Sequence, residues 1–230
     1  MQPVSQSTER PTGDAIGFTQ FVALMAALTA LNALAIDSML PALPQIGAAL
    51  HVTTDNERQW VITAYLLGVS SAQMIYGVLA DRFGRKRILL TAVAIYGCFA
   101  IVAAFATTMP QLIAARFLMG AGAAGVQVLC VSIVRDRYSG AQMARVMSLT
   151  FMVFLTAPVL APSIGQAIML VASWRMIFAF LATFSLCLLI WASLRLPETL
   201  QAEDHLPLEL GRVAQAFRAA KMGTPTARCG

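Results

Sequence analysis

Two ionisable side chains stand inside long apolar stretches of this sequence, where charge is rare. Asp37 lies in NALAIDSMLPALP, near the end of the first apolar stretch. A carboxylate in hydrocarbon is costly, so such an acid usually faces a cavity or a partner. Asp37 is therefore a candidate proton site; an acid at the membrane surface, in contact with water, is the alternative. Arg116 is either an inward-facing base beside an acid or a base whose side chain reaches back to the headgroups.

The segment GVLADRFGRKRILL, residues 77–90, concentrates charge between two apolar stretches. Its charged residues are Asp81, Arg82, Arg85, Lys86 and Arg87. The bases alone would hold a loop on the cytoplasmic side, but an acid at a helix C-terminus is unfavourable without a partner. Candidate partners for Asp81 are Arg85, Arg135 and the N-terminus of a helix packed against it. Gly77 and Gly84 predict a tight contact and a tight turn.

Small and helix-bending residues form two further patterns. Pro158 and Pro162 in TAPVLAPSIG are four residues apart and share a helix face. Together with Gly165 they predict a bendable helix, although membrane helices tolerate proline in general. The glycines of GAGAAG, residues 120–125, favour close helix packing around Arg116.

The composition is that of an integral membrane protein. Of the 230 residues, 58% are hydrophobic and only 12% are charged, and the mean hydropathy is +0.72. A chain of this kind cannot bury its apolar residues in one water-soluble core. We expect an all-α membrane protein with six transmembrane helices, near 17–39, 59–80, 88–108, 111–134, 145–171 and 174–194.

The basic residues predict the topology. With six spans, thirteen of the sixteen Lys and Arg residues fall on one side of the membrane, and only Arg58 and Arg175 fall in the opposite loops. Both termini are therefore expected in the cytoplasm. The net charge of +5 then reflects topology and not nucleic-acid binding. Residues 1–16 form the N-terminal tail and 195–230 a cytoplasmic segment, with an amphipathic stretch near 206–220.

Enzyme and metal chemistry find little support in the sequence. The two histidines, His51 and His205, fall in loops on opposite sides, so no Ser/His pair or metal cluster is expected within the membrane. The four cysteines contain no CxxC pair and are expected to pack as small apolar residues. No Walker A sequence is present, so nothing indicates that ATP drives the protein.

Six segments of the sequence resemble a known family. GVLADRFGRKR (77–87) resembles the signature that joins spans 2 and 3 of the major facilitator superfamily, G-x-L-A-D-R-x-G-R-K/R. RFLMGAGAA (116–124) resembles its fourth-span motif. APVLAPSIG (157–165) resembles the span-5 antiporter motif in its Bcr/CflA drug-efflux variant, with Ala157 and Ala161 where glycine is common. DSMLPALP (37–44), WRMIF (174–178) and LPET (196–199) are also similar to Bcr/CflA segments, and the resemblance covers about 17–220.

The resemblance implies drug:proton antiport across a bacterial inner membrane, with small drugs and protons as the transported partners. The proton gradient would be the energy source, and no cofactor or metal would be needed. It implies that Asp37 is the proton or cationic-drug site, that Arg116 is its electrostatic partner, and that Asp81 belongs to a cytoplasmic gate.

Members of the family have two six-span halves with a cavity between them, and this sequence resembles the N-terminal half alone. A C-terminal half is therefore an expected partner. The alternative is a membrane protein that does not transport, either as a truncated half or for want of its partner half. An intramembrane enzyme is the weakest hypothesis.

Overall fold

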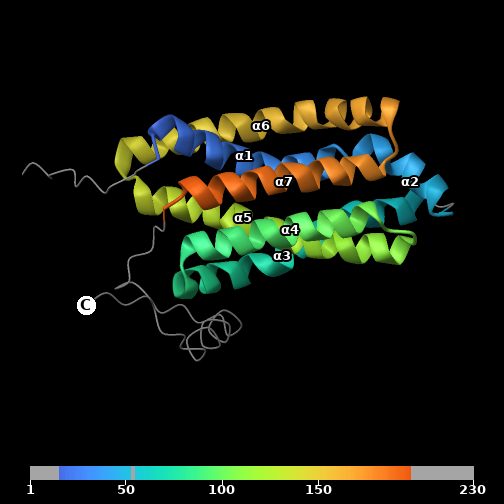
Figure 1. The fold of residues 1–230 in the computed structure, drawn as a ribbon, viewed down its shortest axis with the longest axis horizontal. Helices are drawn as coiled ribbons and strands as arrows, with labels where there is room; N and C mark the ends of the chain where they lie inside the picture. The colour runs from blue at the N-terminus through green and yellow to red at the C-terminus, as the bar shows by residue number, and fades with distance from the viewer. Residues whose placement is uncertain (1–15, 53–54, 198–230) are drawn as a thin grey trace, which may run out of the picture.

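The computed structural model describes residues 16–52 and 55–197, and its regular structure there is entirely helical (Figure 1). The elements in chain order are α1 (Phe18–Asp37), a short 3-10 helix η1 (Leu40–Ala42), α2 (Leu43–Ala49), α3 (Asp55–Phe83), α4 (Arg85–Ala104), α5 (Met109–Arg137), α6 (Gly140–Val171) and α7 (Arg175–Arg195). In this part of the chain, six helical segments are long and apolar enough to cross a membrane. The prediction of an all-α protein with six spans is confirmed.

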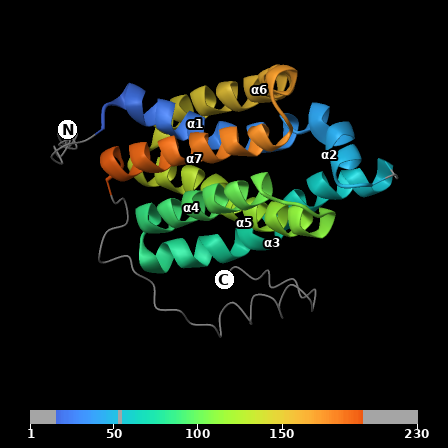
Figure 2. The same cartoon turned by 45° about the vertical axis from the view of Figure 1, so that its right-hand side comes forward.

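The helices run further into the charged segments than their apolar residues alone indicate. Asp81 and Arg82 belong to the last turn of α3, and α4 begins at Arg85, so Gly84 alone separates the two helices. The residues expected as a loop between the first two spans carry η1 and α2 (Figure 2). The amphipathic stretch near 206–220 and most of the two terminal tails lie outside the described residues.

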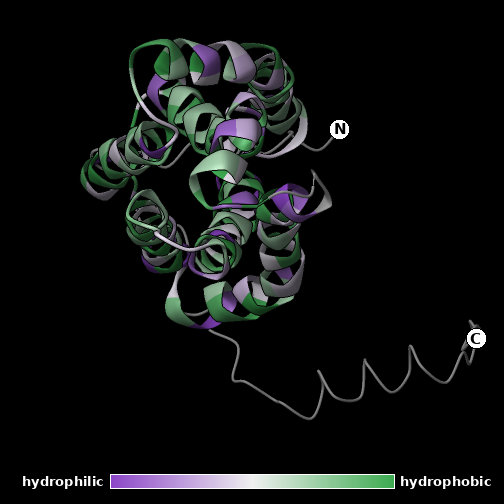
Figure 3. Ribbon diagram, turned by 90° about the vertical axis from the view of Figure 1, so that its right-hand side faces the viewer, coloured by the Kyte–Doolittle hydropathy of each residue, from purple (hydrophilic) through white to green (hydrophobic). Residues whose placement is uncertain are grey.

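Helix α5 is the centre of the bundle. It packs against α3 on one side and α4 on the other, while α7 packs on α4 and α6 packs on α1 (Figures 1 and 2). Of the six spans, α5 is the most buried and α6 the least. Seen end-on, most residues along the helices are hydrophobic, with polar residues between them (Figure 3). Many large apolar side chains, such as Leu155 and Val159 of α6, are exposed, as a lipid environment allows.

Glycines set the closest helix contacts, as the GAGAAG pattern predicts. A β-carbon at Gly120 would overlap the Tyr65 carbonyl of α3, and one at Gly122 would meet the α4 backbone at 2.7 Å. Gly68 on α3, which sequence reasoning missed, lies equally close to the Phe117 carbonyl of α5. The tight contact expected at Gly77 is not found, because a β-carbon there meets nothing within 4 Å among the described residues.

Gly84 makes the turn between α3 and α4 possible. Its φ of 93° and ψ of 141° lie in a region that L-residues rarely adopt. We therefore expect Gly84→Ala to lower the free energy of unfolding by about 1–3 kcal/mol. Thermal unfolding in detergent, followed by circular dichroism, measures this. Gly17→Ala is the control, because Gly17 has a φ of −59° and open space around it; an equal loss in both variants would contradict the role of the turn.

Candidate functional site

Asp37 is the last residue of α1, where the chain leaves the helix for η1. Its side chain is half-buried and makes no ion pair with any described residue. The next residue, Ser38, is buried and ends the helix by donating both its N–H (3.2 Å) and its hydroxyl (2.5 Å) to the Leu34 carbonyl. The acid therefore stands at a well-ordered helix end, and no cation in the described part of the chain pairs with its carboxylate.

Arg116 is fully buried in the bundle, which excludes the alternative in which it reaches the membrane surface. Its Nη2 donates to the Ala35 carbonyl at 3.1 Å and its Nε to the Val61 carbonyl at 3.2 Å. The N–H of Met39 bonds to Ile36, so the Ala35 carbonyl relies on Arg116 in place of the usual i+4 donor. A cation on the last carbonyls of a helix also complements its dipole.

Arg116 thus joins α1, α3 and α5 two residues before Asp37. It is the backbone of α1, and not the Asp37 carboxylate, that it contacts among the described residues. Arg116 consequently fixes the position of the helix end that carries Asp37. A direct electrostatic interaction between the two side chains stays a prediction.

A polar network that sequence reasoning missed extends from Arg116 toward the middle of the membrane. The Arg116 guanidinium carbon lies 4.4 Å from the Tyr65 ring centroid, a cation–π contact. The Tyr65 hydroxyl donates to Asn32 Oδ1 at 2.6 Å. Deeper in the bundle, Gln73 Nε2 donates to Gln127 Oε1 at 3.3 Å. The sequence signal that could have revealed this network is the presence of polar side chains inside apolar stretches, because such side chains need partners within the protein.

Helix α6 meets α1 through its small residues. Ala157, Ala161 and Gly165 are buried and recur every four residues along one face. A β-carbon at Gly165 would overlap the Ser38 carbonyl, next to Asp37. Ala157 and Ala161, which stand where glycine is common, thus still permit a close approach to α1. Pro158 is exposed and Pro162 half-buried, so the proline face points away from this contact.

A small cavity lies between α1, α5 and α6. Its volume is about 110 Å³, and its lining includes Met25, Gln127, Met147, Thr150 and Phe154. Thioether and aromatic groups with a few polar atoms are typical of sites that accept varied apolar ligands. Among the described residues, no group of three or more His, Cys, Asp or Glu side chains is placed to hold a metal ion.

The charged segment forms a cluster at the opposite end of the bundle. Arg85 Nη2 lies 3.2 Å from Asp81 Oδ1, one helical turn away. Arg85 is thus one of the partners that the sequence predicted for Asp81. Arg85 Nε lies 2.6 Å from Asp136 Oδ2 on α5. Arg135, another expected partner of Asp81, is exposed, and no ion pair joins the two among the described residues. Its neighbour Asp136, which sequence reasoning missed, instead gives Arg85 a second acid. Arg85 bridges α3, α4 and α5 between two acids.

The six apolar spans, a buried arginine and a carboxyl at a helix end define a multi-pass helical membrane protein. Residues 25–222 match the Major Facilitator Superfamily, and the chain belongs to this family. The resemblance seen in the sequence is confirmed.

Three relatives are similar over most of this chain. It is 34% identical over 190 residues to the "Uncharacterized MFS-type transporter YdgK" of Bacillus subtilis (82% of this chain, 47% of the relative). It is 30% identical to the "Bicyclomycin resistance protein homolog" of Haemophilus influenzae (86% and 49%) and 33% identical to "Multidrug resistance protein MdtL" of Escherichia coli (79% and 46%). The chain spans about half the length of these relatives, and the names of the last two fit the Bcr/CflA type.

The fold agrees with a solved structure of the family. The inward-open xylose transporter XylE from E. coli superposes with a TM-score of 0.71 at 12% identity, over 90% of this chain and 57% of that one. At this identity the likeness concerns the fold alone.

Proposed function

We propose that this chain is the N-terminal half of a proton-coupled multidrug exporter of the bacterial inner membrane, with both termini in the cytoplasm. Its relatives include proteins named for multidrug and bicyclomycin resistance. The excess of bases on one side of the membrane supports the orientation. Drug would leave the cell in exchange for protons that enter, so the proton gradient would supply the energy.

The observation that carries this proposal is the placement of Asp37. Its carboxyl is half-buried and unpaired among the described residues, and the backbone beside it is held by Arg116 from α5 and by Gly165 from α6. A carboxyl in this setting can take up a proton on one side and release it on the other when α6 moves against α1. The prolines of α6 would ease that movement, because each removes a backbone hydrogen bond.

The other features fit the same cycle. The cavity beside Gln127 is mostly apolar with a few polar groups, but its volume of about 110 Å³ is smaller than the roughly 300 Å³ of a drug site. It would therefore be only part of a site that a second half completes. The Asp81–Arg85–Asp136 cluster would close the cytoplasmic end of the bundle and open when the ion pairs separate. This cluster lies about 30 Å from the Arg116–Val61 contact near Asp37, since twenty residues of α3 separate Val61 from Asp81.

The second candidate is a half that does not transport without its partner. Helix α6 exposes a continuous apolar face that includes Phe151, Leu155 and Val159, and the chain spans about half the length of its relatives. A second six-helix half would cover such a face in a complete transporter.

Drug resistance of cells that express the chain, alone and with the C-terminal half of a relative, separates three cases: a half that transports by itself, a half that needs its partner, and a truncated half that does not transport. We expect resistance with the second half present, and its loss in Asp37→Asn, because an amide cannot carry the proton. Asp37→Glu is expected to keep part of the activity, and Glu57→Gln, which changes an exposed acid, is the matched control.

Resistance that Asp37→Asn leaves unchanged would contradict the proton role. If the wild-type chain gave no resistance with either arrangement while it was present in the membrane, the non-transporting alternative would hold. Proton release on drug addition, measured with the protein in detergent, gives an independent readout of the same carboxyl.

A further inference from the structure

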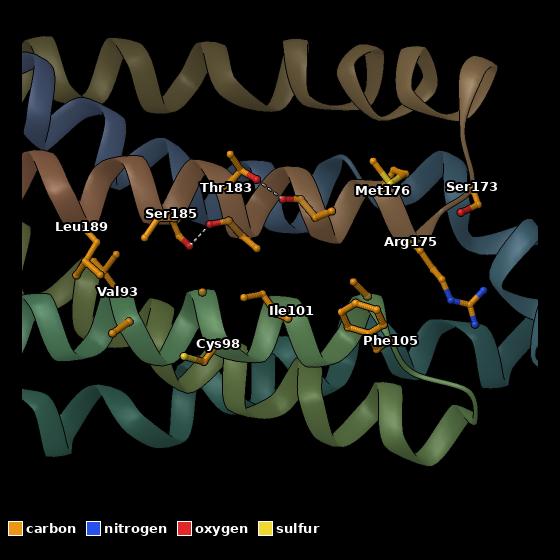
Figure 4. A pocket seen from close by; sticks show the side chains of 16 residues that line it. Val93, Cys98, Ile101, Phe105, Ser173, Arg175, Met176, Thr183, Ser185 and Leu189 are labelled. Carbon is orange, nitrogen blue, oxygen red and sulfur yellow. Dashed lines mark hydrogen bonds between the residues drawn. The ribbon is translucent and has the colours of Figure 1, made fainter.

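A groove runs along the bundle between α4 and α7, away from the site described above. It encloses about 600 Å³ and shares no lining residue with the surroundings of Asp37, Arg116 or Asp81 (Figure 4). Nothing in the proposed transport cycle uses this groove, which lies between two outer helices. An inference about it therefore does not depend on the proposed function.

Small residues form the floor of this groove. A β-carbon at Gly97 of α4 would lie 2.5 Å from Ser185 Oγ of α7, so the two helices approach closely there. Ala94 and Ala182 add to this low floor. The larger side chains of Ile101 and Leu186, which are about half exposed, border the groove. The groove is therefore a narrow, elongated depression, called the trough below, whose shape an extended apolar chain could fill.

Two α7 hydroxyls in the lining are already hydrogen-bonded within their own helix. Thr183 Oγ1 donates to the Ala179 carbonyl at 2.9 Å, and Ser185 Oγ donates to the Ala182 carbonyl at 2.8 Å (Figure 4). A polar drug would find few partners along the trough. Hydrocarbon needs none, so the lining favours an acyl chain.

Arg175 stands at one end of the trough, beside Ser173 (Figure 4). Its Nη2 donates to the Ala106 carbonyl at 2.9 Å, and its guanidinium carbon lies 4.5 Å from the Trp174 ring centroid. No acid among the residues whose side chains are described pairs with it, so it keeps N–H groups for an anion. A long basic side chain near the end of a span commonly reaches the headgroup level.

The length of the trough matches one membrane leaflet. Its lining runs from Val93 to Phe105 along α4, which is about 18 Å of helix. Half of the hydrocarbon core of a bilayer is about 15 Å thick. A lipid whose phosphate contacts Arg175 would thus lay one acyl chain along the whole trough.

We propose that the α4–α7 groove is a binding site for one phospholipid, with its phosphate on Arg175 and an acyl chain along the trough. A bound lipid of this kind would fill the space between the two helices and stiffen this flank of the bundle. Phosphate recognition by arginine does not depend on the rest of the headgroup, so the site would accept several phospholipid classes.

Lipid retention by the full chain tests this proposal. The protein is equilibrated with vesicles of phosphatidylethanolamine and phosphatidylglycerol, extracted in mild detergent, and its bound lipids are counted by native mass spectrometry. We expect one lipid to be retained by the wild type and lost in Cys98→Phe, since Cys98 is exposed and lines the trough. Arg175→Gln is expected to weaken retention about tenfold, while Arg175→Lys keeps most of it.

Two matched controls localise the effect. Cys187→Phe adds the same ring to an exposed cysteine of α7 that does not line the trough, and Arg195→Gln removes the exposed arginine at the other end of α7. Both should retain the lipid. Equal retention in all variants, or equal loss in the controls, would overturn the proposal. So would protection of Cys98 from a lipid-soluble maleimide by a co-expressed second half and not by lipid, because the groove would then be a helix interface.

Discussion

Arg116→Met is expected to lower the free energy of unfolding by about 3 kcal/mol, the largest loss among single substitutions of exposed or buried arginines. Methionine fills much of the volume but donates no hydrogen bond. The Ala35 carbonyl would lose its donor, and the Tyr65 ring would lose the guanidinium above it. The end of α1 would then be free to shift, and Asp37 with it.

Thermal unfolding in detergent gives the stability, and drug resistance with a second half gives the function. Arg116→Lys should recover only part of the stability, because an ammonium cannot span the Ala35 and Val61 carbonyls as a planar guanidinium does. Arg135→Met, at the exposed end of the same helix, should change stability by less than about 0.5 kcal/mol. A wild-type melting curve for Arg116→Met would show that the three-helix contact contributes nothing.

The crossing of α3 and α5 is expected to be equally sensitive to one added methyl group. Gly68→Ala and Gly120→Ala should each cost about 2–3 kcal/mol, since the new carbon overlaps backbone that cannot rotate aside. Separation of the two helices would also carry the Val61 carbonyl and the Tyr65 ring away from Arg116.

The stability of the double variant shows whether the cost comes from pushing the two helices apart or from strain at each site. Both substitutions push the same pair of helices apart, so the cost of the double variant should fall well below the sum of the single costs. Gly77→Ala is the control on α3: its β-carbon meets open space, and alanine favours the helix by about 0.5–1 kcal/mol. Additive costs, or a loss in Gly77→Ala as large as the others, would contradict this account.

Hydropathy was sufficient to predict the six spans, because a helix that crosses lipid must be apolar along some twenty residues whatever it packs against. It did not find their ends. At Asp81 and Arg87 the helices continue into charged residues, since the backbone there stays hydrogen-bonded once the apolar stretch has left the membrane core. The residues of α2, expected as loop, are helical for the same local reason, with Pro44 near the start of the helix.

Side-chain partners were harder to predict than spans. The GAGAAG motif placed Arg116 beside close-packing glycines. Its acceptors, however, are the backbone carbonyls of Ala35 and Val61, which lie 81 and 55 residues away. Every residue has a carbonyl, so residue type carries no signal for such a pairing. Asp136 was overlooked beside Arg135 because one residue turns a helical side chain by about 100°.

The sequence by itself determined the membrane class, the number of spans, the family and the residues that can carry charge within the bundle. These follow from composition and from local motifs, which need no partner to be recognised. Only the tertiary structure decided that Arg116 holds the end of α1, that Asp136 shares Arg85 with Asp81, and that Gly165 meets Ser38. Those contacts depend on the distance and rotation of helices packed side by side, which the crossing geometry sets and hydropathy does not encode.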